Sequence, residues 1–420
     1  MCFILKLEDA RAPSSSLIAS ISVVNKDIHV CAQNCGQNRN CTSFGFNQQT
    51  GECLLQSTVS SDPTATPIPS PGFVFLDLPL DSDNRCVVTS DCPKYEQCVD
   101  KVRCDCTSPV FSGDCSEGQI LVLGSGYPSY SRSIELLKMA NGTSRTSSVP
   151  LPWSRRYHEL AVFGSDTLAI VGGLTNTSES DEVPLALTDV DFLNLATGTI
   201  TSGPSMPGPA VISFGVAKLD NCLFVCGGGQ ALHRLTESVD ACRKLCQHPV
   251  TQQFSWQDVA PLSSARRRLS MAALGGYVYA VGGYDRDGNY LSLVERYDPS
   301  TDTWEVKSAM TVAKEGMDLA VLGDKIYTCG GYRGAAFSLL KSCERYDPVT
   351  DTWTTVGSMN RARHLYQLVA AEGKLYAVAG WNPDDSGTRT TVEVYDPAID
   401  LWTEHQWLNT ERTILGAAVL

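Results

Sequence analysis

The chain has 420 residues, of which 43% are hydrophobic and 19% charged, so it is long enough for more than one globular domain. Its formal net charge of −13 leaves no large basic surface to neutralise phosphates, which argues against a nucleic-acid-binding protein. No run of about 18 apolar residues occurs, so no membrane span is expected.

Cysteine is unevenly distributed: eleven of the 17 cysteines precede residue 116. This gradient is typical of small disulfide-rich domains from an oxidising compartment, followed here by a larger domain. Three N-x-[ST] triplets, at Asn40, Asn141 and Asn176, agree with a secreted glycoprotein. The first residues, MCFILKLEDARAPSSS, lack the pattern of a signal peptide, so either the signal lies outside this sequence or the protein is not secreted.

The segment CAQNCGQNRNCTSFGFNQQTGECLLQ predicts a helical turn that carries Cys31 and Cys35, followed by two strands. It resembles the PAN or apple domain, a small α+β disulfide-rich module, and we assign residues 1–80 to it. The resemblance leaves Cys2 without an evident partner. The disulfides that it implies join Cys31 with Cys53 and Cys35 with Cys41.

The next cysteine-rich segment is CVVTSDCPKYEQCVDKVRCDCTSPVFSGDC, with a C-x-C followed by a glycine-containing loop. Residues 81–118 resemble an EGF-like module. About 30 residues cannot bury a sufficient core, so disulfides must support such a fold. Asp81 and Asp83 do not have the calcium-binding spacing to the first cysteine, so no calcium is expected. The disulfides that the resemblance implies join Cys86 with Cys98, Cys92 with Cys104, and Cys106 with Cys115.

From residue 119 onward, a unit of about 50 residues recurs six times. Segments such as YVYAVGG and KIYTCGG are each followed by a strand and turn of the type ERYDPSTDTW, and the spacing of apolar runs predicts four strands per unit. The pattern resembles the kelch repeat, which implies a β-propeller with one repeat per blade. We therefore expect a mainly β protein in which residues 119–420 form a six-bladed propeller. The strands before the double glycine start at Ile120, Leu168, Leu223, Val278, Ile326 and Leu375.

The two ends of the repeat region are incomplete in complementary ways. A strand of the type LAVLG precedes each glycine-ending strand except the first, and residues 413–420, TILGAAVL, supply one more such strand. We expect residues 413–420 to complete the first blade and close the ring, which removes two sheet edges. Four tryptophans share one repeat position and are expected to be buried between neighbouring blades. They are Trp256, Trp304, Trp353 and Trp402.

The segment CLFVCGGGQALHRLTESVDACRKLC contains four cysteines that could ligate a metal, act in redox chemistry or form disulfides. Residues that face each other in antiparallel strands have a constant index sum. That sum is 468 both for Cys226 with Cys242 and for Cys222 with Cys246, which favours two disulfides in one register. These pairs would lie about 13 Å apart, too far to share zinc, and buried free thiols are the plainer alternative. A third pair at the repeat positions of Cys226 and Cys242 is Cys329 with Cys343.

The sequence contains no nucleophile elbow, phosphate-binding glycine loop or metal-ligand spacing of histidines, so no catalytic residue, metal or cofactor is expected. A basic residue precedes the LAVLG strand in five of the six repeats. These side chains either form a cationic ring for an acidic peptide or a sialylated glycan, or bond to neighbouring backbone. The loops after the double glycine vary in length and charge, which favours them as the specificity-determining surface. The basic positions are Arg156, Arg266, Lys314, Arg363 and Arg412. The loop residues expected to contact a ligand are Tyr284, Tyr290, Tyr332, Arg333 and Trp381.

We therefore expect a non-enzymatic, extracellular binding or adhesion protein that recognises a protein or a glycan. One alternative is an intracellular kelch adaptor of a ubiquitin ligase, which requires a BTB-type domain that is not seen before residue 119. A second alternative is a kelch-fold enzyme acting on sialic acid-like sugars, with the basic ring as its carboxylate site. Disulfides in the propeller would favour the extracellular protein over the adaptor.

Overall fold

The computed structural model describes residues 119–420 except for 125–131, 140–141, 148–149, 164–166, 176–184, 231–236, 249, 335–337 and 406. Before residue 119 it describes the backbone of six short strands. The chain divides into two compact units, 1–105 and 106–420. The triplets at Asn40, Asn141 and Asn176, and the sulfur atoms expected to pair before residue 116, lie outside the described atoms.

In the first unit, four antiparallel strands form one sheet in the order β1-β3-β2-β4. The two strands expected from SFGFN and ECLL are confirmed as β2 and β3. Within residues 81–118, the described elements ahead of the propeller are the paired β5 and β6, which do not by themselves establish an EGF-like module. The strands are β1 (Leu17–Ser22), β2 (Ser43–Asn47), β3 (Glu52–Gln56), β4 (Phe73–Asp77), β5 (Asp105–Cys106) and β6 (Gly113–Asp114).

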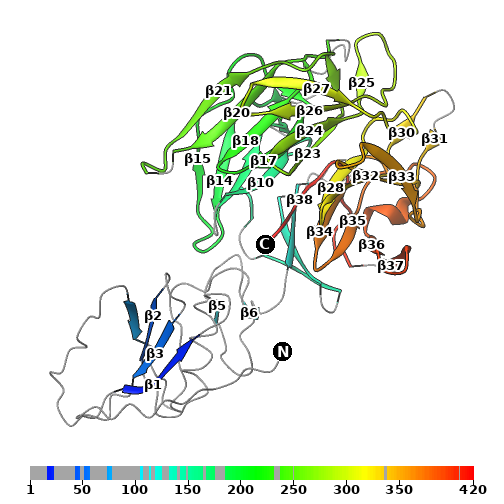
Figure 1. Cartoon of the computed structure of the whole chain (residues 1–420). Helices are drawn as coiled ribbons and strands as arrows, with labels where there is room; N and C mark the ends of the chain where they lie inside the picture. Colours follow the sequence, from blue (N-terminus) through cyan, green and yellow to red (C-terminus); the bar gives the residue numbers. More distant parts are fainter. Residues whose placement is uncertain are drawn as a thin grey trace. The chain divides into compact units, whose positions relative to one another are not determined.

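Six four-stranded antiparallel sheets follow, which confirms the six-bladed propeller (Figure 1). From the inner strand outward, blade 1 consists of β38 (Gly416–Val419), β7 (Gln119–Leu123), β8 (Ile134–Lys138) and β9 (Thr143–Thr146). Blade 2 consists of β10 (Glu159–Phe163), β11 (Thr167–Val171), β14 (Val190–Asn194) and β15 (Ile200–Ser202). Blade 3 consists of β17 (Gly215–Leu219), β18 (Cys222–Cys226), β20 (Cys242–Gln247) and β21 (Phe254–Val259).

The last three blades have strands of five residues throughout. Blade 4 consists of β23 (Ser270–Leu274), β24 (Tyr277–Val281), β26 (Val294–Asp298) and β27 (Thr303–Lys307). Blade 5 consists of β28 (Asp318–Leu322), β29 (Lys325–Cys329), β32 (Cys343–Asp347) and β33 (Thr352–Val356). Blade 6 consists of β34 (Gln367–Ala371), β35 (Lys374–Val378), β36 (Val392–Asp396) and β37 (Leu401–His405). Shorter elements are β12 (Leu174–Thr175), β13 (Leu185–Ala186), β16 (Val211–Ile212), β19 (Gly229–Gln230), β22 (Arg266–Arg267), β25 (Tyr284–Asp285), β30 (Tyr332–Arg333), β31 (Ser338–Leu339) and the 3-10 helix η1 (Ser386–Arg389).

The inner strand of each blade contacts the inner strands of both neighbouring blades, so the six inner strands surround one axis. All inner strands begin at the same end of the propeller, where the loops between second and third strands also lie. We call this end the loop face. The opposite end, the turn face, carries tight turns such as Gly275-Gly276, whose positive φ values of 62° and 84° suit a two-residue hairpin.

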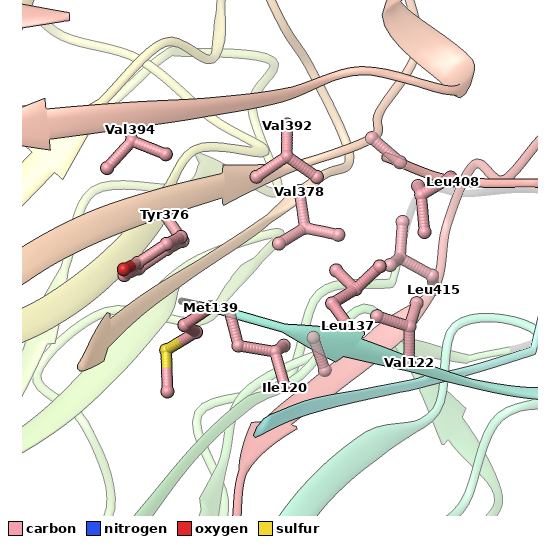
Figure 2. Packing of buried hydrophobic residues seen from close by; sticks show 12 residues of the cluster. Ile120, Val122, Leu137, Met139, Tyr376, Val378, Val392, Val394, Leu408 and Leu415 are labelled. Atoms are coloured by element: carbon pink, nitrogen blue, oxygen red, sulfur yellow. The ribbon is translucent and has the colours of Figure 1, made fainter. Parts of the chain in front are cut away.

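The ring closes as expected, because β38 pairs with β7 from Gly416 opposite Leu123 onward. The amide of Leu420 also donates to the carbonyl of Gln119 at 2.9 Å, so both of these residues lie at the turn face. Figure 2 shows the packing beside this seam, where Ile120 and Leu137 of blade 1 face Val378 of blade 6. The closure therefore has both backbone hydrogen bonds and a shared hydrophobic core.

Neighbouring blades are held together at their outer strands by an Asp and a Trp that hydrogen-bond to the amide and the carbonyl of one residue at the end of the preceding blade, an arrangement that we call the grip. In blade 4, the indole N–H of Trp304 donates to the carbonyl of Ala260 at 2.8 Å, and the Asp302 carboxylate accepts from the amide of Ala260 at 2.9 Å. The hydroxyl of Tyr297 donates to the same carboxylate oxygen at 2.7 Å. Blade 5 grips Ser308 and blade 6 grips Gly357 in the same way.

Blade 3 keeps only half of this grip. Its Trp256 donates to the carbonyl of Pro204 at 2.8 Å, but proline has no amide hydrogen, and Phe254 stands two residues before the tryptophan, where the other blades have Asp. The tryptophans are also less covered than expected. Trp402 is buried, whereas Trp256, Trp304 and Trp353 are half-buried, because an outer strand has solvent on its far side.

We predict that Trp402→Ala lowers the free energy of unfolding by about 3–5 kcal/mol, because a buried indole and a hydrogen bond between blades are lost. The matched change Trp353→Ala removes the same hydrogen bond from a half-buried ring and should cost roughly 1–2 kcal/mol. Denaturant unfolding of the two variants checks the order. Equal losses would show that burial of the ring does not set the difference.

Candidate functional site

At the loop face the chain enters each inner strand through one residue with a φ between 52° and 59°. In blades 4, 5, 6 and 1 the amide of this residue donates to the carbonyl of its counterpart in the preceding blade, for example Arg268 to Ser213 at 2.6 Å. These bonds form a belt around the mouth of the central channel and offset the strain of a left-handed backbone. The six residues are Tyr157, Ser213, Arg268, Gly316, Leu365 and Ile414.

Below this belt the first residues of the inner strands line a cavity on the axis, to which all six blades contribute. Glu159 of blade 2 and Asp318 of blade 5 place two carboxylates there. Asp318 accepts hydrogen bonds from the Ser270 hydroxyl and the Leu368 amide, both at 2.7 Å, yet burial raises its pKa to about 6. Burial and the charge of Asp318 raise the pKa of Glu159 well above its usual range.

The basic positions expected to form a cationic ring do not face a ligand. Arg266, Arg363 and Arg412 are fully buried. Each pairs with a glutamate on the third strand of its own blade, with N–O distances of 2.6 Å to Glu295, 3.0 Å to Glu393 and 3.3 Å to Glu135 respectively. The ring prediction is therefore wrong and the backbone-bonding alternative is right, because these guanidinium groups also donate to carbonyls of their blades. The carboxylate site of the sugar-enzyme alternative loses its basis.

The basic position of blade 2 differs by one residue from the expected one. Arg155, not Arg156, is the buried residue there, and it pairs with Asp191 at 2.7 Å. Arg156 is half-buried, and its backbone pairs with Leu174. The doublet Arg155-Arg156 makes either register equally good from sequence alone.

Four of the five loop residues expected to contact a ligand lie close together, and a histidine joins them. The ring centroids are 5.0 Å apart for Tyr284 and Tyr290, 5.7 Å for Tyr290 and Tyr332, 5.8 Å for Tyr332 and His364, and 6.1 Å for His364 and Trp381. We call these five residues the aromatic arc. The tyrosines and the tryptophan are half-buried, so each ring is held in place but still reaches solvent. Arg333 is exposed on β30 and makes none of these ring contacts.

The ion pair between Arg268 and Glu315 contacts the aromatic arc at His364. The carboxylate of Glu315 accepts from Arg268 at 2.8 Å and lies 3.3 Å from Nε2 of His364. Burial acts to raise the pKa of Glu315, but its bonds to His364 and Arg268 hold that pKa below the usual value. Arg267 stacks on Tyr284 with its guanidinium 4.6 Å from the ring centroid. Charged side chains thus contact two of the five rings, His364 and Tyr284.

Sequence reasoning missed His364, Glu315 and Arg268. Each follows a basic position of the repeat by one or two residues, and that offset from the repeat is the signal that could have identified them. Among the described residues, no group of three or more histidine, cysteine or acidic side chains is arranged to hold a metal ion. No helix in the described part of the chain is long and apolar enough to span a membrane.

Comparison with known proteins agrees with this architecture. The family model of the kelch motif matches residues 265–311, 316–360 and 362–404, which are blades 4 to 6. The chain carries kelch repeats. A PAN domain model matches residues 10–78. The kelch motif matches omit blades 1 to 3, whose outer strands depart most from the repeat, although the fold of these blades is the same.

Similar proteins match only part of this chain. Kelch-like protein 26 of Mus musculus is 41% identical over 92 residues, which are 22% of this chain and 14% of that protein. An F-box/kelch-repeat protein of Arabidopsis thaliana is 39% identical over 105 residues, 25% of this chain and 27% of that protein. Human kelch-like protein 33 is 36% identical over 107 residues, 25% of this chain and 19% of that protein. The likeness therefore extends to a set of kelch repeats and covers about a quarter or less of each relative.

We predict that Glu159→Gln stabilises the propeller at pH 8 and has little effect at pH 4. A carboxylate whose pKa is raised in the folded state stabilises the fold below its unfolded pKa, about 4.5, and that stability is lost as the pH rises through the folded value. The neutral glutamine avoids this loss. Free energies of unfolding at both pH values check the sign. If the variant is less stable than the wild type at pH 8, the ionised Glu159 side chain does not destabilise the fold and the prediction is wrong.

Proposed function

We propose that this chain is a non-enzymatic extracellular protein whose propeller binds a protein ligand at the loop face. The observation that carries the proposal is the aromatic arc, a row of five neighbouring rings from blades 4, 5 and 6, of which all but His364 are half-exposed. Tyrosine and tryptophan are enriched among the residues that dominate binding energy in protein interfaces, and rigid side chains lose little entropy on binding. Arginine is also enriched among such residues, and Arg333 is exposed next to Tyr332.

The extracellular setting is supported by the cysteines of the propeller. Cys222 faces Cys246 and Cys226 faces Cys242 in the expected register, and both pairs are disulfide-bonded, as are Cys329 and Cys343. Such bonds persist outside the reducing cytosol. A specific observation favours the rival function, an intracellular adaptor of a ubiquitin ligase: parts of the chain are similar to kelch-like and F-box/kelch-repeat proteins.

Peptide selection on the full chain tests the binding site. Peptides enriched from a phage-displayed random library should lose at least about tenfold in affinity with Tyr290→Ala, Tyr332→Ala or Trp381→Ala. The control is Val349→Ala, which changes an 85% exposed side chain on the turn face and should leave affinity unchanged. Equal binding to all variants would contradict the arc as the site. If the chain binds glycans on an array and selects no peptide from the library, the ligand is a sugar and not a protein.

Thiol mapping of the chain purified from its native tissue tests the compartment. Peptide mass spectrometry without reduction should find Cys226 linked to Cys242 and Cys222 linked to Cys246, because an oxidising compartment forms and keeps such bonds. Free thiols at these four positions would contradict the extracellular assignment and favour the intracellular adaptor.

A further inference from the structure

On the loop face, a loop joins the second and third strands of each blade. We call the point where the two strands separate the base of the loop, and the loop is closed where contacts hold the strands together there. In blades 4, 6 and 1 a buried arginine closes it by donating to one carbonyl at the end of the second strand and one at the start of the third. Arg266 donates to Gly282 and Leu293 at 3.2 and 3.3 Å. Arg363 donates to Ala379 and Thr391 at 2.6 and 3.1 Å, and Arg412 to Gly124 and Ser133 at 2.7 and 3.3 Å.

Blades 3 and 5 have no arginine at this position, whereas in blade 2 Arg155 pairs with Asp191 and donates to the Ile170 carbonyl at 3.5 Å. In blade 3 the basic position holds Val211, and the acidic position on the third strand holds Arg243, which turns outward to Asp258. In blade 5 the basic residue is Lys314, whose Nζ lies 3.7 Å from the Glu344 carboxylate. That Nζ and the nearer oxygen of Glu344 have no hydrogen-bond partner among the described residues. A lysine ammonium lacks the planar fork with which arginine reaches two carbonyls and a carboxylate at once.

The same two blades contain the disulfides that join their second and third strands at this end. Cys226–Cys242 in blade 3 and Cys329–Cys343 in blade 5 link the last residue of the second strand to the first residue of the third. Where arginine is present, this register holds apolar pairs instead, such as Val281 opposite Val294 in blade 4. A buried arginine is thus present in blades 1, 2, 4 and 6, and a disulfide at this end is present in blades 3 and 5.

We propose that these two disulfides replace the arginine bridge, so that among the described blades the loop bases of blades 3 and 5 depend on the thiol–disulfide state. Loop 330–342 carries Tyr332, whose ring contacts both Tyr290 and His364 in the aromatic arc. Reduction by a dithiol breaks the S–S bond with two electrons and two protons, yields two cysteine thiols and leaves the reductant as a disulfide. The effect on ligand binding rests on the proposed function, whereas the closure of the loop does not.

Hydrogen exchange of the oxidised full chain tests the closure. Cys329→Val with Cys343→Val gives blade 5 the apolar pair of blade 4 while keeping Lys314. The amides of Tyr332 and Leu340, which are bonded to Glu315 and Gly331, should then exchange at least about tenfold faster. The amide of Leu291 in the blade 4 loop serves as the internal reference and should not change. Adding Lys314→Arg recreates the full arrangement of blade 4 and should restore slow exchange.

Two results would overturn the proposal: unchanged exchange in the valine variant, or no recovery with Lys314→Arg. The control Cys222→Ser with Cys246→Ser removes the disulfide at the turn face and should leave residues 330–342 unaffected. If the valine variant does not fold, the wild type and Lys314→Arg are compared after incubation with dithiothreitol. Exchange in loop 330–342 should then rise in the wild type and stay slow in Lys314→Arg, and equal acceleration would refute the proposal.

Peptide binding separates this proposal from the proposed function. Peptides that depend on Tyr332 should bind the valine variant more weakly and recover with Lys314→Arg. If no peptide depends on Tyr332, the proposed site fails, and the exchange rates still decide whether the disulfide closes the loop.

Discussion

A guanidinium group removed from water must have its donors satisfied, and this requirement organises the loop face of the propeller. In blade 4 the Glu295 carboxylate binds Arg266 and also accepts from the amide of Ser263, so one carboxylate ties the third strand to the segment that enters the blade. The seam of the ring uses the same pair, since Arg412 and Glu135 are 277 positions apart in the chain. Removing either partner of such a pair would leave a buried charge without compensation. Ring closure and local blade geometry thus depend on one type of contact.

Because these contacts lie beneath the loops, the loops themselves are free to differ. The parts that repeat are those that hold blades together: the grip of Asp302 and Trp304 on Ala260, and its equivalents in blades 5 and 6. The aromatic arc does not repeat, and its rings come from loops and linkers of three different blades. A repeated scaffold with non-repeated loops is the usual arrangement of recognition surfaces on rigid folds.

A feature formed within one blade could be predicted from the sequence more easily than a feature formed between blades. The register of Cys222 with Cys246 and Cys226 with Cys242 was predictable because two uninterrupted antiparallel strands leave no freedom in the index sum. The basic column was visible, but its role was not, because a repeat position does not reveal whether a side chain points into the channel or behind the strands. Glu315 and His364 were missed for a related reason. They meet only because consecutive linkers converge on the axis, which no single repeat encodes.

The closing strand also determines at which end of the propeller the ring is joined. Gln119 and Leu420 lie side by side at the turn face, joined by a hydrogen bond of 2.9 Å, while the aromatic arc lies at the loop face. The two strands that close the ring are therefore joined at the end of the propeller opposite the aromatic arc, so the closure and the arc do not compete for the same surface.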